Sequence, residues 1–599
     1  MALLTLMKGM RFISNPKIVL TTLNAKFIHS SLALRSLKMF SSDISKNLHL
    51  LEFTINNDAD FIVSKLFKEK ADVIAFSCYI WNIETTLYII NTLKKISPET
   101  KIVVGGPEVS YNAEDILLEN SIDIIVRGEG EVPFRELVGY FQGQKELSEI
   151  KGVSYKKGRT IIENESGVTV ELKEIPFVYE NDLEDLENRI IYYEASRGCP
   201  FRCSYCLSSA SNEVRNLEID RVFSDLDFFL QNKVKQVKFI DRTFNWNKEN
   251  CLEIWKYLIK KDNGVTNFHF EICAELLEES HLDMLRQARE GIFQFEIGVQ
   301  STNEETLKFI ERRTNTKKLF ERIEEIKSLK NIHLHLDLIA GLPREDYKSF
   351  SNSFNDVYNL KPEQLQLGFL KLLKGSKVRE ESKKGSLVYR EKAPYEILYT
   401  DVLSYSDILE LKSIENMVDT FYNSRKFIFT CEYIVSKFET PFEFYQKLGQ
   451  YWEENKYDYC QHTKSKLYCI LYDFFQKMKK GEEEIAEIEE LKNILKFDMF
   501  YSDVMKSTPN WLQGNLKSEE TEKIKQVYRD SEKMKRIAPE IPTKQASKLC
   551  QIEKFEYDII NWIKTDFKIL NKQQCFIIFN YSRKKGVNAD GYPYDIVDI

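Results

Sequence analysis

The sequence predicts an α/β protein of several domains, with a helical region at its carboxyl end. Two stretches, residues 17–128 and 190–373, alternate short apolar runs with amphipathic segments, and the alternation then stops. This rhythm is typical of parallel sheets covered by helices. The chain has 599 residues, and domains commonly hold roughly 100 to 200, so we expect three or four units.

In the first stretch, five β-rich runs are separated by segments with helical periodicity. The runs are residues 17–25, 48–55, 71–80, 101–106 and 122–128. They predict a doubly wound, Rossmann-like parallel sheet, which we assign to residues 10–148. Residues 149–188 change character, to a small β-hairpin and an acidic connector, and are interpreted as a linker.

Small and polar residues stand at or just beyond the carboxyl ends of four of these runs. They are Thr22, Asn24, Ser77, Gly105, Gly106, Pro107, Glu108, Gly128 and Glu129. Ligands of open parallel sheets bind beyond the carboxyl ends of the strands, so these residues are candidate cofactor contacts. One glycine after a strand can be plain turn chemistry, but four such endings on one rim favour a ligand. No GxGxxG or GxxxxGK motif is present, which argues against a nicotinamide, flavin or nucleoside triphosphate site.

Three cysteines stand close together at Cys199, Cys203 and Cys206. Three thiolates on one loop can bind three irons of a 4Fe-4S cluster and leave the fourth iron open. A structural zinc would require a fourth ligand, and the next cysteine and histidine in sequence are Cys251 and His269. The other eight cysteines show no disulfide framework, which indicates a reducing, cytoplasmic location.

The second stretch supplies six strand–helix steps, including the strand before the cysteines, and predicts a partial (β/α)6 barrel over residues 189–375. Polar residues near its strand ends are Asp241, Glu271, Glu296, Gln300 and Asp337. A carboxylate that faces a barrel interior is costly unless it binds something, so these are candidate cofactor or network residues. His333 and His335 share one face and are expected to be packed or solvated rather than metal ligands.

From residue 376 to 599 the sequence favours a mainly α-helical domain, with two short strands around a turn at the end. The formal charge of −7 gives no basic field for nucleic-acid binding. No apolar run approaches the ~18 residues of a membrane span. We therefore expect neither nucleic acid nor membrane as a partner.

The spacing Cys-x3-Cys-x2-Cys resembles the motif of the radical SAM superfamily, and Tyr205 matches the aromatic position that packs on adenine. The resemblance implies that Cys199, Cys203 and Cys206 hold a 4Fe-4S cluster that cleaves S-adenosylmethionine. It also implies that residues 296–301 contact the ribose and methionine, and that the segment 338–343, with Gly341, lies beside the adenine. Asp241 matches a position that meets the methionine amine or the substrate.

Ser77 with Gly105 and Gly106 resembles the cobalamin-binding domain of B12-dependent enzymes. The Asp-x-His-x-x-Gly motif of that family, whose histidine ligates cobalt, is missing. His29 lies in the corresponding loop but lacks the aspartate and the glycine. We therefore expect cobalamin without a histidine ligand, and leave open for His29 either a contact to cobalamin or substrate or a loop role.

Together, residues 17–375 resemble cobalamin-binding radical SAM enzymes, in a subgroup with an extra helical domain. The leading hypothesis is a methyltransferase that acts on an unactivated carbon. The alternatives are a cobalamin-dependent radical rearrangement or cyclisation without methyl transfer, and a cobalamin or redox sensor. The resemblance implies a small-molecule or peptide substrate, and an external electron donor such as flavodoxin or ferredoxin.

Overall fold

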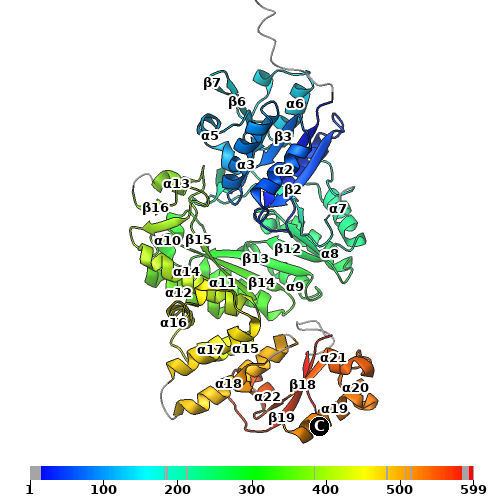
Figure 1. Ribbon diagram of the computed structural model, residues 1–599, viewed down its shortest axis with the longest axis vertical. Helices are drawn as coiled ribbons and strands as arrows, with labels where there is room; N and C mark the ends of the chain where they lie inside the picture. Colours follow the sequence, from blue (N-terminus) through cyan, green and yellow to red (C-terminus); the bar gives the residue numbers. More distant parts are fainter. Residues whose placement is uncertain are drawn as a thin grey trace, which may run out of the picture.

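The computed structural model describes residues 15–180, 183, 186–210, 213–382, 385–479, 483–502, 504–505, 508–512, 516–582 and 593–597 (Figure 1). The predicted α/β class and the helical carboxyl-terminal region are confirmed. The amino-terminal domain (blue) and the last part of the chain (orange and red) lie at opposite ends of the central barrel. Residues 10–14 of the first predicted domain, and residues 583–592 of the predicted terminal turn, lie outside the described residues.

The first sheet contains the five predicted parallel strands, in the order β2-β1-β3-β4-β5. The strands are β1 (Ile18–Asn24), β2 (Leu48–Thr54), β3 (Val73–Ser77), β4 (Lys101–Gly105) and β5 (Ile124–Val126). The helices are α1 (Leu32–Phe40), α2 (Ala59–Lys68), α3 (Ile83–Ile96), α4 (Pro107–Ser110), α5 (Ala113–Glu119) and α6 (Glu131–Phe141). β1 is buried along its whole length, because separate apolar cores cover the two faces of the sheet.

The predicted hairpin after this domain joins the same sheet. β6 (Val153–Lys157) pairs antiparallel with β5, and β7 (Thr160–Glu163) pairs with β6. The segment predicted as a linker thus begins with two strands that extend the first sheet at its edge.

The barrel is a second sheet of six parallel strands, in the order β15-β14-β13-β12-β11-β8. The strands are β8 (Ile191–Tyr193), β11 (Gln236–Phe239), β12 (Asn267–Glu271), β13 (Phe293–Gln300), β14 (His333–Ala340) and β15 (Gln364–Phe369). The helices between them are α7 (Ile219–Gln231), α8 (Lys248–Lys260), α9 (Glu279–Leu285), α10 (Glu304–Phe309), α11 (Thr316–Ser328) and α12 (Tyr347–Asn359). The partial barrel predicted from the sequence is therefore confirmed.

Alternating residues give the barrel strands two unlike faces. In β13 the apolar residues, such as Phe293 and Phe295, are fully buried, while Glu296, Gly298 and Gln300 between them are partly accessible. Successive side chains of a strand point to opposite faces, so one face packs on the helices and the other is polar.

The carboxyl-terminal region is mainly helical and shares one continuous apolar core with the barrel. Its helices are α13 (Lys377–Ser382), α14 (Tyr405–Met417), α15 (Ile428–Val435), α16 (Pro441–Glu454), α17 (Lys464–Met478), α18 (Glu483–Ser502), α19 (Ser518–Arg529), α20 (Ser531–Ile537), α21 (Ala546–Leu549) and α22 (Ile559–Lys564). A hairpin precedes the long helices, and a small sheet of β18 (Cys550–Phe555), β19 (Cys575–Asn580) and β20 (Tyr594–Ile596) ends the chain. No helix among the described residues is long and apolar enough to cross a membrane.

The hairpin of β16 (Leu387–Tyr389) and β17 (Ile397–Thr400) reaches the amino-terminal domain. The hydroxyl of Tyr395 donates a hydrogen bond of 2.8 Å to Glu108 Oε2, and both side chains are buried. Lys374 donates to the main-chain oxygen of Glu108 at 3.3 Å. Burial raises the pKa of the Glu108 carboxyl, although Tyr395 and Lys374 oppose the shift.

The substitution Tyr395→Phe should destabilise this contact, because it leaves the buried Glu108 carboxyl without its hydroxyl donor. The expected loss is about 1–3 kcal/mol, seen as a lower midpoint of thermal unfolding. Tyr399→Phe is the matched control, since Tyr399 is an exposed tyrosine of the same hairpin. Equal midpoints for the two variants would show that the contact does not stabilise the protein.

Candidate active site

A cavity of about 610 Å³ lies where the first sheet meets the barrel. Six of the predicted cofactor contacts line it: Ser77, Gly105, Gly106, Pro107, Gly128 and Glu129. Helix α1 and Tyr79 complete the wall on the amino-terminal side, and Arg197, Ser208 and Arg242 face it from the barrel. The carboxyl ends of β3, β4 and β5 thus open onto one space.

Three other candidates on this rim lie outside the cavity lining. The Thr22 hydroxyl donates to the Ser77 main-chain oxygen at 3.0 Å, and the Asn24 amide donates to the His29 main-chain oxygen at 3.2 Å. Glu108 turns to Tyr395 instead. All three are used in local or interdomain hydrogen bonds, so a cofactor role for them stays a prediction.

The two glycines at the end of β4 differ in whether their positions could accept a side chain. Gly106 has a φ of +105°, and a Cβ there would stand 2.5 Å from the Cys78 main-chain oxygen, so the fold itself requires glycine. A Cβ on Gly105 would meet Val126 at an ordinary 3.6 Å. A longer side chain at Gly105 would therefore take up space in the cavity without straining the backbone.

A half-buried ion network joins the two domains next to this cavity. Arg197 pairs with Glu129 at 3.0 Å and with Glu131 at 2.8 Å, both from the amino-terminal domain, and with Glu194 of the barrel at 2.8 Å. Arg215 also pairs with Glu129. Burial opposes the charge, but the carboxylates hold the pKa of Arg197 above its usual value.

The cysteine loop follows Arg197 directly. Gly198 has a φ of +114°, and any side chain there would overlap the main-chain oxygen of Glu213. Main-chain hydrogen bonds of 2.9 Å tie Ser204 to Ile310 and to Val378, which fixes the loop against the barrel. The loop is thus tied at Ser204, between its second and third cysteines, to the barrel and to α13.

Cys199, Cys203 and Cys206 line a second cavity of about 200 Å³. Arg312 approaches Cys203 Sγ at 3.9 Å and the Tyr205 hydroxyl at 3.4 Å. Burial raises the pKa of Cys203, and the Arg312 guanidinium opposes that shift. The site therefore offers three thiols with a cation beside one of them, a donor set suited to an iron–sulfur cluster.

A fourth cysteine, Cys273, lines the same cavity, which the sequence spacing did not indicate. It follows β12, and its Sγ lies 3.6 Å from Glu275 Oε2. Burial and the neighbouring Glu275 raise the pKa of Cys273 to about 11, so it is a neutral thiol at physiological pH. Cys199, Cys203 and Cys206 share one loop, whereas Cys273 follows a different strand and its thiol donates to Glu275.

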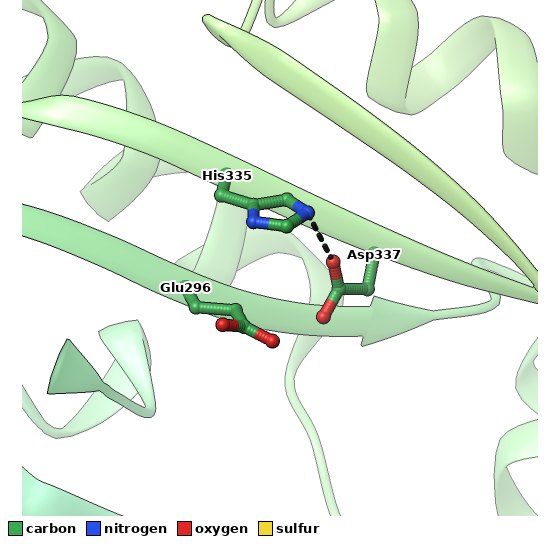
Figure 2. A group of neighbouring side chains, drawn as sticks. All are labelled: Glu296, His335 and Asp337. Atoms are coloured by element: carbon green, nitrogen blue, oxygen red, sulfur yellow. Dashed lines mark ion pairs between the residues drawn. The ribbon is translucent and has the colours of Figure 1, made fainter. Parts of the chain in front are cut away.

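The barrel contributes Glu271, Glu296, Gln300 and Asp337 to this second cavity, together with Tyr205. Lys238 Nζ lies 2.8 Å and His269 Nε2 3.0 Å from Glu296 Oε2. Burial opposes the charge on Glu296, but His269 and Lys238 hold its pKa well below the usual range. Burial raises the pKa of Glu271 to about 7. Figure 2 shows Glu296 with its neighbours His335 and Asp337 on the next strand.

Two further candidates lie outside the lining of this second cavity. Asp241 is buried, accepts from the Ala195 main-chain N–H at 3.1 Å and from the Ser196 hydroxyl at 2.5 Å, and has a pKa raised by burial to about 7. It thus orders the turn that leads to the cysteines. Gly341 has a φ of +82°, and a Cβ there would stand 2.6 Å from Ile397.

Several site residues escaped the sequence reasoning. Arg242 and Ser208 line both cavities, and Arg312 borders the cluster loop. Arg242 follows Asp241 near a strand end. This position is the one feature of the sequence that could have indicated it. Lys238 and His269 have no local signal, because their pairing depends on strand register, and for His335 the sequence indicated the strand face but not its partners.

His29 lies outside the lining of the first cavity. Its Nδ1 is 2.6 Å from the hydroxyl of Tyr192 on β8, so it links the amino-terminal loop to the barrel. Burial lowers the pKa of His29, helped by Lys26 and Lys238. The ring is thus used in a domain contact.

Comparison with known proteins assigns the same segments to known families. Residues 18–138 match the B12 binding domain, residues 193–357 match the radical SAM superfamily, and residues 383–579 match a domain described as a protein of unknown function, DUF4080. The chain therefore combines a B12-binding domain with a radical SAM domain, as the motifs predict. These domains imply cobalamin, a 4Fe-4S cluster and S-adenosylmethionine as cofactors.

Individual relatives are distant. The cobalamin-dependent radical SAM methyltransferase TokK of Streptomyces tokunonensis is 23% identical over 320 residues, which cover 48% of this chain and 44% of TokK. The 2-(S-pantetheinyl)-carbapenam-3-carboxylate methyltransferase of Streptantibioticus cattleyicolor is 24% identical over 304 residues, with the same coverage of 48% and 44%. The chain spans less than half the length of these curated relatives.

Among solved structures, the cobalamin-dependent S-adenosylmethionine radical enzyme OxsB, with aqua-cobalamin and S-adenosylmethionine bound, superposes with a TM-score of 0.56. The match covers 81% of this chain and 83% of OxsB at 15% identity. It shows a shared fold.

The substitution Gly105→Leu should abolish cobalamin binding and leave the cluster in place, because the added side chain projects into the first cavity only. Bound cobalamin is measured by absorbance after gel filtration, and iron is measured on the same sample. Gly105→Ala, whose Cβ fits beside Val126, is the control. Unchanged cobalamin affinity in the leucine variant would place the cofactor elsewhere.

We expect bound cobalamin to have no histidine ligand, because His29 is held by Tyr192 outside the cavity. Electron paramagnetic resonance of the cob(II)alamin form should show no nitrogen superhyperfine coupling, in the wild type or in His29→Ala. Free cob(II)alamin with its own base coordinated provides the positive reference. A coupling that disappears in His29→Ala would contradict this expectation.

Proposed function

We propose that this chain, which joins a B12-binding domain to a radical SAM domain, is a cobalamin-dependent radical SAM enzyme that methylates an unactivated carbon. The observation that carries the proposal is the junction of the two cavities, which share Arg242 and Ser208 as lining residues. The two cavities therefore adjoin, with Arg242 and Ser208 between them.

The residues present fit the implied cofactors. Cys199, Cys203 and Cys206 offer three thiols in one cavity, which leaves one iron of a cluster open for S-adenosylmethionine. Gly105, without a side chain, lines the larger cavity for cobalamin. When bound, the cluster supplies the electron that cleaves S-adenosylmethionine, and cobalamin carries the methyl group.

The chain's own side chains set the charge around the reaction. Arg312 places a buried cation beside Cys203 and Tyr205, where a cluster adds negative charge. Arg242 lies between the cavities, and its charge lowers the pKa of Glu271 against the effect of burial. With a pKa of about 7, the Glu271 carboxyl can accept or hold a proton at neutral pH.

The substrate we propose is a small molecule or a peptide, bound at the second cavity. The electron donor is an external protein such as flavodoxin or ferredoxin, and the compartment is the reducing cytoplasm, which suits eleven cysteines without disulfide pairing. We propose no role for nucleic acid or membrane. The cofactor contacts of Tyr205 and Gln300, which line the second cavity, form part of the same proposal.

The test is incubation of the reconstituted enzyme with S-adenosylmethionine labelled at the methyl group. Candidate substrates are supplied as pools of small molecules and peptides. Label in a product carbon, together with 5'-deoxyadenosine, supports the proposal. The triple variant Cys199→Ala, Cys203→Ala, Cys206→Ala should lose iron and form no 5'-deoxyadenosine, yet keep cobalamin, because the first sheet has its own cores.

Two results would replace the proposal. 5'-Deoxyadenosine with an altered but unlabelled product would indicate a radical rearrangement or cyclisation. Cluster and cobalamin binding without cleavage of S-adenosylmethionine, under reduction and with each substrate pool, would indicate a sensor. Cleavage by the triple cysteine variant would overturn the assignment of the cluster.

A further inference from the structure

The polar face of the barrel carries a compact group of metal-ligand side chains, Glu296, His335 and Asp337 (Figure 2). Glu296 on β13 is paired in register with His335 on β14, and Asp337 follows two residues later on the same face. One ligand atom from each, two carboxylate oxygens and an imidazole nitrogen, lies within 4.8 Å of the others. Glu296 and Asp337 are the residues expected from the sequence to face a cofactor, and their surroundings point to another occupant.

Two atoms of this group are buried without hydrogen bonds. His335 Nε2 lies 3.1 Å from Asp337 Oδ1, but the ring and the carboxylate are not oriented to form a hydrogen bond. His269 Nε2 lies 3.0 Å from Glu296 Oε2 and likewise lacks a hydrogen bond. His335 is only 6% exposed, so solvent does not satisfy its nitrogen. Buried polar atoms normally have a partner, and each exception requires an explanation.

The spacing of these atoms fits two ligands of one metal ion. Bonds from zinc to nitrogen or carboxylate oxygen are about 2.0–2.2 Å long, so neighbouring ligand atoms stand roughly 3.0–3.5 Å apart. The 3.1 Å between His335 Nε2 and Asp337 Oδ1 falls in that range. Such a separation without hydrogen-bond alignment is what two atoms directed at a shared cation would show.

Glu296 is positioned to supply the third ligand. Lys238 donates a hydrogen bond of 2.8 Å to its Oε2, and no hydrogen bond to Oε1 is present among the described residues. The positive charge of Lys238 opposes a cation, so it should limit the affinity.

We propose that Glu296, His335 and Asp337 bind a divalent transition-metal ion of the Mn²⁺, Fe²⁺ or Zn²⁺ class. One imidazole and two carboxylates form a mixed nitrogen and oxygen set, which suits these ions better than a soft one. Three protein ligands leave coordination positions for water or for an oxygen group of a substrate in the second cavity, which Glu296 and Asp337 line.

Manganese binding to the full chain tests this proposal. The protein is reconstituted anaerobically with its cluster and cobalamin, both in oxidised states that give no paramagnetic resonance signal. Mn²⁺ is then titrated, and loss of the six-line signal of the free ion reports binding. Mn²⁺ favours oxygen and nitrogen over thiolate, so the cysteine loop should not contribute. We expect one bound ion per chain.

Ligand variants assign the site. His335→Ala and Asp337→Asn should each weaken Mn²⁺ binding by about 10- to 100-fold or more. His333→Ala, on the same strand and face but outside the group, is the matched control and should bind as the wild type does. Cobalamin content serves as the check that each variant is folded. Absence of saturable binding in the wild type, or equal binding in the ligand variants, would overturn the proposal.

A gain of affinity provides the test that misfolding cannot imitate. Lys238→Met removes the cation beside Glu296 and should tighten Mn²⁺ binding on the order of tenfold, because charge repulsion is strong in a partly buried site. Unchanged or weaker binding in Lys238→Met would contradict the assignment of Glu296 as a ligand.

Discussion

The ion pairs of Arg197 are the interaction on which the arrangement of the site depends. Its half-buried guanidinium binds two glutamates of the first domain and one of the barrel, and the cysteine loop begins two residues later. Such ion pairs gain little net stability, because desolvation offsets the attraction, but here they join both domains to one side chain. The network therefore sets where the strand ends of one domain stand relative to the cysteines of the other, and so makes the two cavities adjoin.

Periodicity and spacing were sufficient for the parallel strands of both sheets, because helices cover these strands, but they did not place the antiparallel strands β6 and β7 in the first sheet. Five apolar runs and six strand–helix steps correspond to the strands observed. The expectation that ligands bind at the carboxyl ends of parallel strands also predicted correctly that Ser77, Gly105 and Gly128 line one cavity. The same expectation could not distinguish these cavity-lining residues from Thr22, Asn24 and Glu108, which lie outside the cavity lining. A polar side chain that bonds a neighbouring main-chain group has the same sequence signature as one that faces a ligand.

The charged residues of the barrel interior show the other limit of sequence reasoning. Glu296 and Asp337 could be found as carboxylates at strand positions, but their partners come from neighbouring strands. Lys238, His269 and His335 meet them only through the register of β11, β12, β13 and β14. A shift of one residue would turn any of these side chains to the helix side. The alternation of polar and apolar residues in a single strand therefore indicates a polar face, but it does not identify which residues of neighbouring strands pair on that face.

The hairpin before the helical domain connects the carboxyl-terminal region to both cofactor domains. Tyr395 bonds Glu108, which follows the glycines at the end of β4, and Ile397 packs against Gly341 at the end of β14. Helices α17 and α18 lie beyond the barrel, away from the first domain (Figure 1). The carboxyl-terminal region can therefore affect the cavities through this hairpin, which contacts the end of β4 in the first domain and the end of β14 in the barrel. Because the glycine at 341 is needed for the close approach of Ile397, the turn beside the second cavity and the hairpin must pack as one unit.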